Sequence, residues 1–128
     1  MTLVLDAHGV TLLAGHRARL AELRARGEWP PVVPALVLTE ALTSDHRRDF
    51  NENRLLRTCD IRIVAEPLAR AAATLRTAVS GARRPSAVDA IVVAQADELG
   101  GATVLTSDAR DLRALARYTT NAVVIGVG

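Results

Sequence analysis

The chain has 128 residues, the usual size of one domain and enough to bury a core, so a single domain over residues 1–128 is expected. Apolar residues make up 49% of the chain and aromatic residues only 2%, which predicts a core of Ala, Val, Leu and Ile. The formal net charge is +2 and all 16 basic residues are Arg; the lack of Lys excludes P-loop nucleotide hydrolysis and Schiff-base chemistry.

The single cysteine and the N-terminal residues bear on where the protein works. Cys59 alone can form no intrachain disulfide and no cluster of thiolate metal ligands. The first residues lack a basic segment leading into a long apolar stretch, and the uncharged runs are too short to cross a bilayer. The sequence therefore predicts a cytoplasmic protein that does not associate with a membrane.

The first half of the chain is expected to alternate strands with helices. The predicted elements are a strand at 2–5, a helix at 10–26, a strand at 32–33 and helices at 35–42 and 45–57. The first strand delivers Asp6 at its carboxyl end, and Gly27 is expected to stop the first helix. Glu40 stands out as an acid in an otherwise apolar stretch that is expected to be buried.

The second half continues this alternation. The predicted elements are a strand at 61–64, helices at 67–79 and 85–98, a strand at 103–106, a short helix at 109–116 and a last strand at 122–127. Strands alternating with helices of this length predict an α/β fold, a three-layer α/β/α sandwich with a mostly parallel central sheet. In such folds the reactive residues gather beyond the carboxyl ends of the strands, where Asp6 and Asp108 are both expected.

Each candidate acid also has a purely structural interpretation. Asp6 is a favoured helix N-cap, and Asp89 follows Ser86 by three residues, as in a capping box. Asp108 and Asp111 fit an N-cap and a first-turn acid, and Glu40 could point to solvent from a helix edge. Capping alone does not require all of these acids to fall at one edge of the sheet, so a shared site is the better interpretation.

A cluster of carboxylates predicts a divalent cation, because like charges raise one another's pKa and a cation removes that repulsion. Oxygen ligands without Cys or clustered His indicate Mg²⁺, with Mn²⁺ as the alternative. Such a site suits phosphodiester hydrolysis. The nearest cations for a nucleic-acid backbone are Arg83, Arg84 and Arg110. A second basic group is at least as well explained as a solvated face; it consists of Arg47, Arg48, Arg54 and Arg57.

Four segments together resemble the PIN-domain family, and within it the VapC toxins, over essentially the whole chain. The segments are 4–7 (VLDA), 34–40 (PALVLTE), 86–94 (SAVDAIVVA) and 105–112 (LTSDARDL). The family's four acids fall on Asp6, Glu40, Asp89 and Asp108, with Asp111 and Thr106 as supporting residues. The chain departs from the family pattern at His8, where Ser or Thr is usual, and at Leu112, where an aromatic is frequent.

The resemblance implies a Mg²⁺-dependent endoribonuclease that is the toxin of a toxin–antitoxin pair. Asp6 and Asp89 would be the principal metal ligands, and Glu40 and Asp108 would complete the site directly or through water. The implied partners are a structured RNA such as transfer or ribosomal RNA, a small VapB-type antitoxin protein and a second copy of the chain. The alternatives are a PIN-type RNA-processing nuclease that is not a toxin and an inactive PIN binding module. A response-regulator receiver would need a Lys, which the chain lacks.

Overall fold

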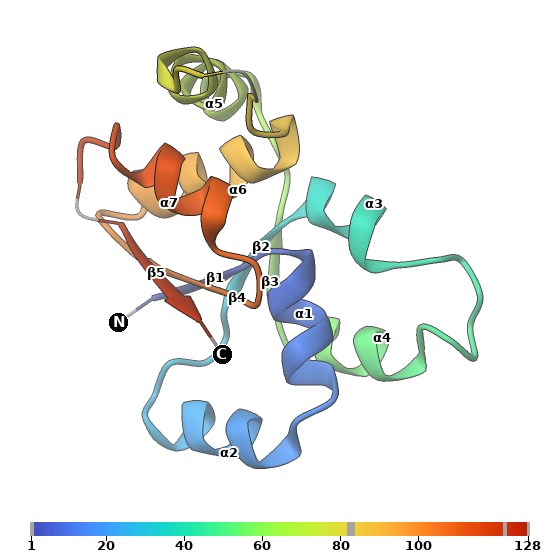
Figure 1. Ribbon diagram of the computed structural model, residues 1–128. Helices are drawn as coiled ribbons and strands as arrows, with labels where there is room; N and C mark the ends of the chain where they lie inside the picture. The colour runs from blue at the N-terminus through green and yellow to red at the C-terminus, as the bar shows by residue number, and fades with distance from the viewer. Residues whose placement is uncertain (1, 82–83, 122, 128) are drawn as a thin grey trace.

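The computed structural model describes residues 2–81, 84–121 and 123–127. Its strands are β1 (Leu3–Leu5), β2 (Val32–Pro34), β3 (Asp60–Arg62), β4 (Thr103–Thr106) and β5 (Val124–Val127). Within the described residues these strands form one sheet in the order β3-β2-β1-β4-β5 (Figure 1). Every neighbouring pair is parallel, so the predicted α/β fold with a mostly parallel sheet is confirmed.

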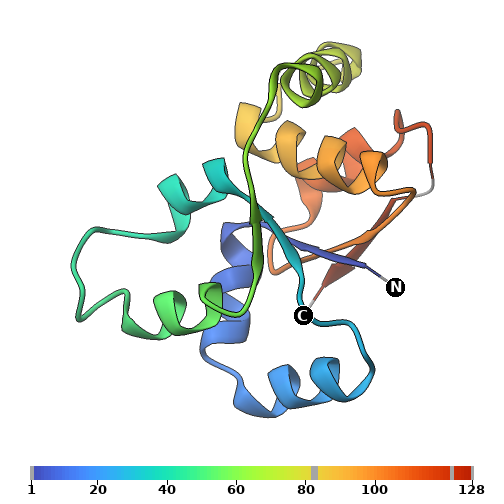
Figure 2. The same cartoon turned by 180° about the vertical axis from the view of Figure 1, so that it is seen from behind.

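Helices cover both faces of this sheet, which gives the three expected layers (Figure 2). The helices are α1 (Ala7–Ala14), α2 (Arg17–Ala25), the 3-10 turn η1 (Ala35–Val37), α3 (Leu38–Ala41), α4 (Phe50–Leu56), α5 (Glu66–Ala78), α6 (Ala87–Glu98) and α7 (Arg110–Ala116). α6 packs on β1, β2 and β4, with α7 and α5 against it, whereas α1 lies on the other face with α2 and α4. No helix in the described part of the chain is long and apolar enough to cross a membrane.

The core is aliphatic, as the composition predicts. Val4, Leu5 and Val104 of the central strands are completely buried. On α6 every residue over 90–96 is buried, because the sheet covers one side of this helix and α5 covers the other. This burial holds α6, and any side chain at its first turn, in a fixed position relative to the sheet.

The single helix predicted over 10–26 is wrong in two respects. The helical segment begins at Ala7, because the Asp6 side chain accepts a hydrogen bond from the N–H of Gly9 and caps the helix. It is then interrupted at Gly15 and His16, whose N–H groups donate to the carbonyls of Leu12 and Leu13, and α2 starts afresh. The predicted stop at Gly27 is consistent with its positive φ of 74°.

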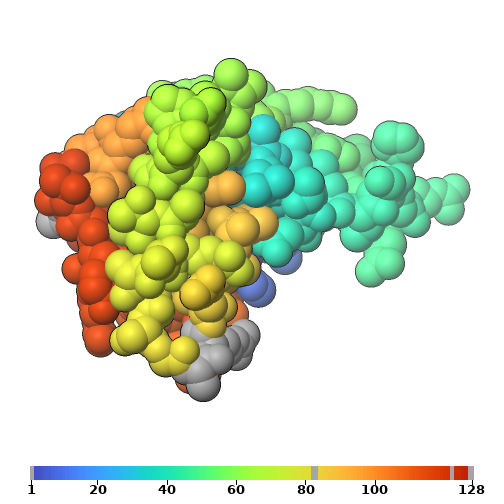
Figure 3. Space-filling view, turned by 90° about the horizontal axis from the view of Figure 1, so that it is seen from above, coloured from blue at the N-terminus to red at the C-terminus, as the bar shows by residue number. Residues whose placement is uncertain are grey.

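The helix predicted over 45–57 is also wrong in its first part. Only Phe50–Leu56 is helical, and the preceding segment is a loop that projects from the body of the molecule (Figure 3). The buried Asp49 carboxylate accepts hydrogen bonds from the N–H groups of Thr43 and Ser44 and from the Thr43 hydroxyl. These side-chain hydrogen bonds give the backbone an alternative to helix and fix the loop.

A glycine brings α1 close to the carboxyl end of β4. A Cβ atom built at Gly9 would lie 2.2 Å from the carbonyl oxygen of Leu105, a distance that no real side chain could occupy. Only glycine therefore allows this approach. The first turn of α1 and the end of β4 meet at the edge of the sheet where the candidate acids were expected.

Candidate active site

Asp6 and Thr106 form the buried floor of the site. β1 and β4 pair in register at Leu5 and Leu105, so the residues that follow them lie side by side. The Thr106 hydroxyl donates a hydrogen bond of 2.7 Å to Oδ2 of Asp6, while Oδ1 of Asp6 accepts the N–H of Gly9 at 2.7 Å. Asp6 is only 3% exposed and Thr106 is fully buried. Both carboxylate oxygens of Asp6 are thus fixed by neighbours from two elements.

Asp89 is placed by the start of α6. The Ser86 hydroxyl caps this helix and accepts a hydrogen bond of 3.1 Å from the N–H of Asp89, as the capping-box pattern predicted. Asp89 is half-buried, and the residues directly after it belong to the wholly buried part of the helix. Its position is therefore set by the packing of the core.

Three further acids are more loosely held. Asp108 lies after β4 and is exposed; its carboxylate is 3.9 Å from Nε2 of His8. It does not cap α7, because the N-cap residue is Ala109, and instead the N–H of Asp108 donates to the Thr106 hydroxyl at 3.0 Å. Asp111 is half-buried in the first turn of α7. Glu40 is exposed on α3, which buries none of its residues, so the expectation of an acid in a buried stretch is wrong.

These acids line one small cavity of about 120 Å³ at the carboxyl edge of the sheet. Its walls come from α1, α3, α6 and the start of α7, and its lining residues are Asp6, Ala7, His8, Glu40, Ser86, Asp89, Asp108 and Asp111. The structure therefore brings together all five acids that the sequence singled out. The cavity-lining positions of Ala7 and Ser86 were not predicted, because a small side chain or a cap carries no chemical signal of its own.

The carboxylates influence one another electrostatically. Burial raises the pKa of Asp6, and the charge of Asp108 raises it further, although hydrogen bonds from Thr106 and Gly9 and the nearby His8 oppose the rise. Burial likewise raises the pKa of Asp89 against the Ser86 hydrogen bond, and the charges of Asp6, Asp111 and Glu40 add to the rise. A cation placed among them would offset both effects.

The donor set fits a hard divalent cation. The cavity offers carboxylate oxygens and no thiolate, and its one imidazole, His8, is exposed. Over residues 2–81, 84–121 and 123–127, no three or more His, Cys, Asp or Glu side chains already converge closely enough to hold an ion. Asp6 and Asp89 are the fixed acids of the site, whereas the exposed Glu40 and Asp108 have room to change rotamer.

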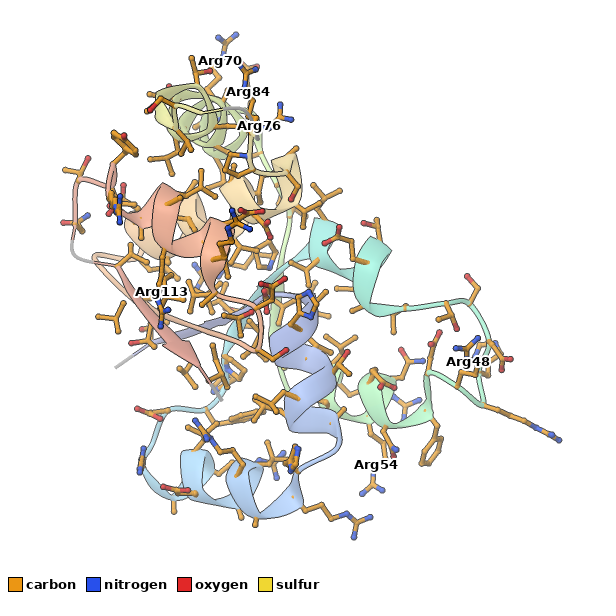
Figure 4. All side chains as sticks on the ribbon, in the orientation of Figure 1. Arg48, Arg54, Arg70, Arg76, Arg84 and Arg113 are labelled. Atoms are coloured by element: carbon orange, nitrogen blue, oxygen red, sulfur yellow. The ribbon has the colours of Figure 1, made fainter. Side chains whose placement is uncertain are left out.

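Two of the candidate RNA-binding arginines, Arg84 and Arg110, do not line this cavity. Arg84 lies beside Arg76, toward α5 (Figure 4), and Arg76 donates a hydrogen bond to the carbonyl of Pro85. Arg110 is exposed and lines a separate hollow next to Asp108. Arg83 lies outside the described residues.

Comparison with known proteins agrees with this arrangement. The sequence model of the PIN domain matches residues 4–118, which is nearly the whole chain and includes all five acids. The chain belongs to the PIN domain family. No protein of curated function matches the sequence of this PIN domain.

Several solved structures have the same fold. One is a toxin–antitoxin complex from Klebsiella pneumoniae, with 22% identity, coverage of 86% of this chain and 89% of that chain, and a TM-score of 0.62. FitAcB from Neisseria gonorrhoeae has 20% identity, coverage of 98% and 96%, and a TM-score of 0.69. VapBC2 from Rickettsia felis, bound to a promoter DNA fragment, has 12% identity, coverage of 100% and 99%, and a TM-score of 0.71. At these identities the likeness is one of fold.

Proposed function

We propose that this PIN domain is a Mg²⁺-dependent endoribonuclease and the toxin of a toxin–antitoxin pair. The observation that carries the proposal is the crowding of five acids around one cavity, where burial and mutual repulsion raise the pKa values of Asp6 and Asp89. The repulsion among these ionised carboxylates would be offset by a bound divalent cation. The PIN family match and the fold shared with toxin–antitoxin complexes support the same conclusion.

Asp6 and Asp89 are proposed as the principal metal ligands, with Glu40 and Asp108 completing the set directly or through water. Thr106 and Gly9 hold the Asp6 carboxylate in one orientation, and the core position of α6 does the same for Asp89. Magnesium, when bound, would activate water and stabilise negative charge that develops on the phosphoryl group. Attack by water with departure of the 3′ oxygen leaves products with a 5′ phosphate and a 3′ hydroxyl.

The test is cleavage of a total RNA pool by the purified chain and by the Asp6→Ala variant. Discrete cuts are expected with Mg²⁺, and they should disappear in the variant and with EDTA. Circular dichroism must show that both proteins are folded, because Asp6 also caps α1. Absence of cleavage by the folded, antitoxin-free wild-type chain would contradict the nuclease proposal, and 2′,3′-cyclic phosphate products would contradict attack by water.

The toxin role has its own test. Inducible production of the chain in a bacterial host should arrest growth, and simultaneous production of a small protein encoded beside it should restore growth. The Asp89→Asn variant should not arrest growth at the same protein level. If the folded, RNA-cleaving chain leaves growth unaffected, the protein is an RNA-processing nuclease and the toxin proposal fails.

A further inference from the structure

A stripe of three arginines runs along α7 beside the acidic cavity. Arg110, Arg113 and Arg117 are exposed, and they line a hollow that also contains Asp108. Because Asp108 lines the acidic cavity as well, the two depressions are adjoining. At 3.6 residues per turn the three arginines lie within roughly 60° of one another around the helix axis, so they form one continuous face. We refer to these three residues as the α7 stripe.

The arginines of the α7 stripe have no partners within the described part of the chain. The arginines that form ion pairs in that part of the chain are Arg26, Arg62 and Arg70, and no guanidinium of the stripe donates a hydrogen bond there. Arg113 is exposed and lies beside β5 (Figure 4). Ala114, between the arginines on the same face, keeps the centre of the hollow open. The positive charges are thus available to a ligand.

Helix stability does not account for the whole stripe. Arg113 in the last turn and Arg117 at the C-cap interact favourably with the negative end of the helix dipole. Arg110, however, is the first residue of α7, where the dipole disfavours a cation. The acids of the adjacent cavity would repel a polyanion, and the positive charge of Arg110 would offset that repulsion as the polyanion approaches.

We propose that the α7 stripe binds the phosphate backbone of RNA and leads the strand to the acidic cavity; this rests on the proposed nuclease function. The stripe extends over seven residues of helix, which at 1.5 Å per residue is about 10 Å. Three guanidinium groups spread over this length can each contact a phosphate of one RNA strand. The hollow offers no aromatic side chain on which a base could stack, so we expect its arginines to contact phosphates, which carry no sequence information.

The test is RNA binding measured without cleavage. Fluorescence anisotropy of a labelled single-stranded RNA is recorded in EDTA over a range of salt concentrations, with Asp89→Asn as the common background. To this background the triple change R110Q/R113Q/R117Q is added. A matched control adds R17Q/R19Q/R26Q, which removes the same charge from exposed positions of α2 and its C-cap, at the far end of α1 from the acidic cavity (Figure 1).

The stripe variant should lower the slope of log K against log salt by about 2, since each single-strand phosphate contact contributes about 0.7. If the stripe variant and its background bind RNA equally at 1 M salt, the stripe variant should therefore bind about 100-fold more weakly than the background at 0.1 M salt. The loss should be the same for two RNAs of unrelated sequence, and the α2 control should keep the slope of the background. Equal losses in both triple variants, or an unchanged slope in the stripe variant, would overturn the proposal.

The outcomes for binding and for catalysis are separable. If the wild-type chain cuts RNA but the stripe variant binds normally, the nuclease proposal stands and the α7 stripe is not the RNA track. If the stripe variant loses binding as expected and the wild-type chain does not cut RNA with Mg²⁺, the stripe is supported and the nuclease proposal fails.

Discussion

Replacing Thr106 with Val should disturb both stability and catalysis, because one buried hydroxyl joins two acids. The hydroxyl donates to Oδ2 of Asp6 at 2.7 Å and accepts the N–H of Asp108 at 3.0 Å. Valine has nearly the same volume, so the loss is that of the hydrogen bonds. A bond to an ionised group contributes about 1.5–3 kcal/mol, and the orphaned buried acceptor makes the upper part of that range the expectation.

A loss of about 2–3 kcal/mol should lower the melting temperature of a domain of this size by roughly 8–12 °C. The cleavage rate should fall by about 10- to 100-fold, the usual cost when a residue that orients a metal ligand is removed. The pKa of Asp6 should rise further above its ordinary value, because the Thr106 hydrogen bond currently lowers it. The acid limb of the pH–rate profile should therefore move to higher pH.

The matched control is Thr106→Ser, which keeps the hydroxyl and removes one methyl group at a cost of about 1 kcal/mol. Urea unfolding followed by circular dichroism measures stability, and single-turnover cleavage across pH measures the rate. If the Val variant matches the Ser variant in stability, rate and acid limb, the Thr106 hydroxyl does not orient Asp6.

Three other changes test the fold and the site. Gly9→Ala should destabilise the fold by about 1–3 kcal/mol or more in urea unfolding, because the new Cβ meets the Leu105 carbonyl, whereas Gly15→Ala, with no atom closer than 3.8 Å, should be close to neutral. Hydrogen bonds from Thr43 and Ser44 outweigh burial and hold the pKa of Asp49 below 3.8, so Asp49→Asn should lower the melting temperature near neutral pH. The difference between the two proteins should vanish as the pH falls below 3.8 and the Asp49 carboxylate of the wild-type chain becomes protonated, and equal losses at all pH values would contradict this. The pKa of Asp89 is raised from 3.8, so the wild-type chain loses stability as pH rises above that value, and Asp89→Asn should melt at a higher temperature at pH 7. Mg²⁺ should raise the melting temperature of the wild-type chain and not that of the Asp89→Asn variant. If Mg²⁺ stabilises the variant to the wild-type extent, Asp89 is not a ligand.

The order of the elements could be predicted because short aliphatic runs and helical spacing report directly on burial. The strand at 103–106 and the helix through Glu98 were identified from these patterns. The break in the helix at Gly15 could not be predicted, because the apolar residues keep their helical spacing on both sides of it. The loop before Phe50 was missed because the hydrogen bonds of Asp49 compete with helix, and propensity does not reveal which acid will make them.

The site was predictable to the extent that it depends on strand ends. Asp6 and Asp108 follow β1 and β4, whose parallel pairing brings those ends together. The sequence left open whether Glu40 is buried or exposed, because the answer depends on how little of α3 the core covers. The role of Gly9 was equally hidden, since only the approach of α1 to β4 shows why a side chain is excluded.

The central claim is that the acidic cavity cuts RNA with Mg²⁺, and single-turnover cleavage of a 5′-labelled RNA by the wild-type chain and by Asp89→Asn tests it most directly. Both proteins should be folded, with the variant at least as heat-stable as the wild-type chain, so a difference in rate cannot be ascribed to unfolding. The account predicts cleavage by the wild-type chain in Mg²⁺, none in EDTA, 3′-hydroxyl products and a loss of at least 100-fold in the variant. Cleavage by Asp89→Asn at the wild-type rate, or cleavage that persists in EDTA, would contradict it.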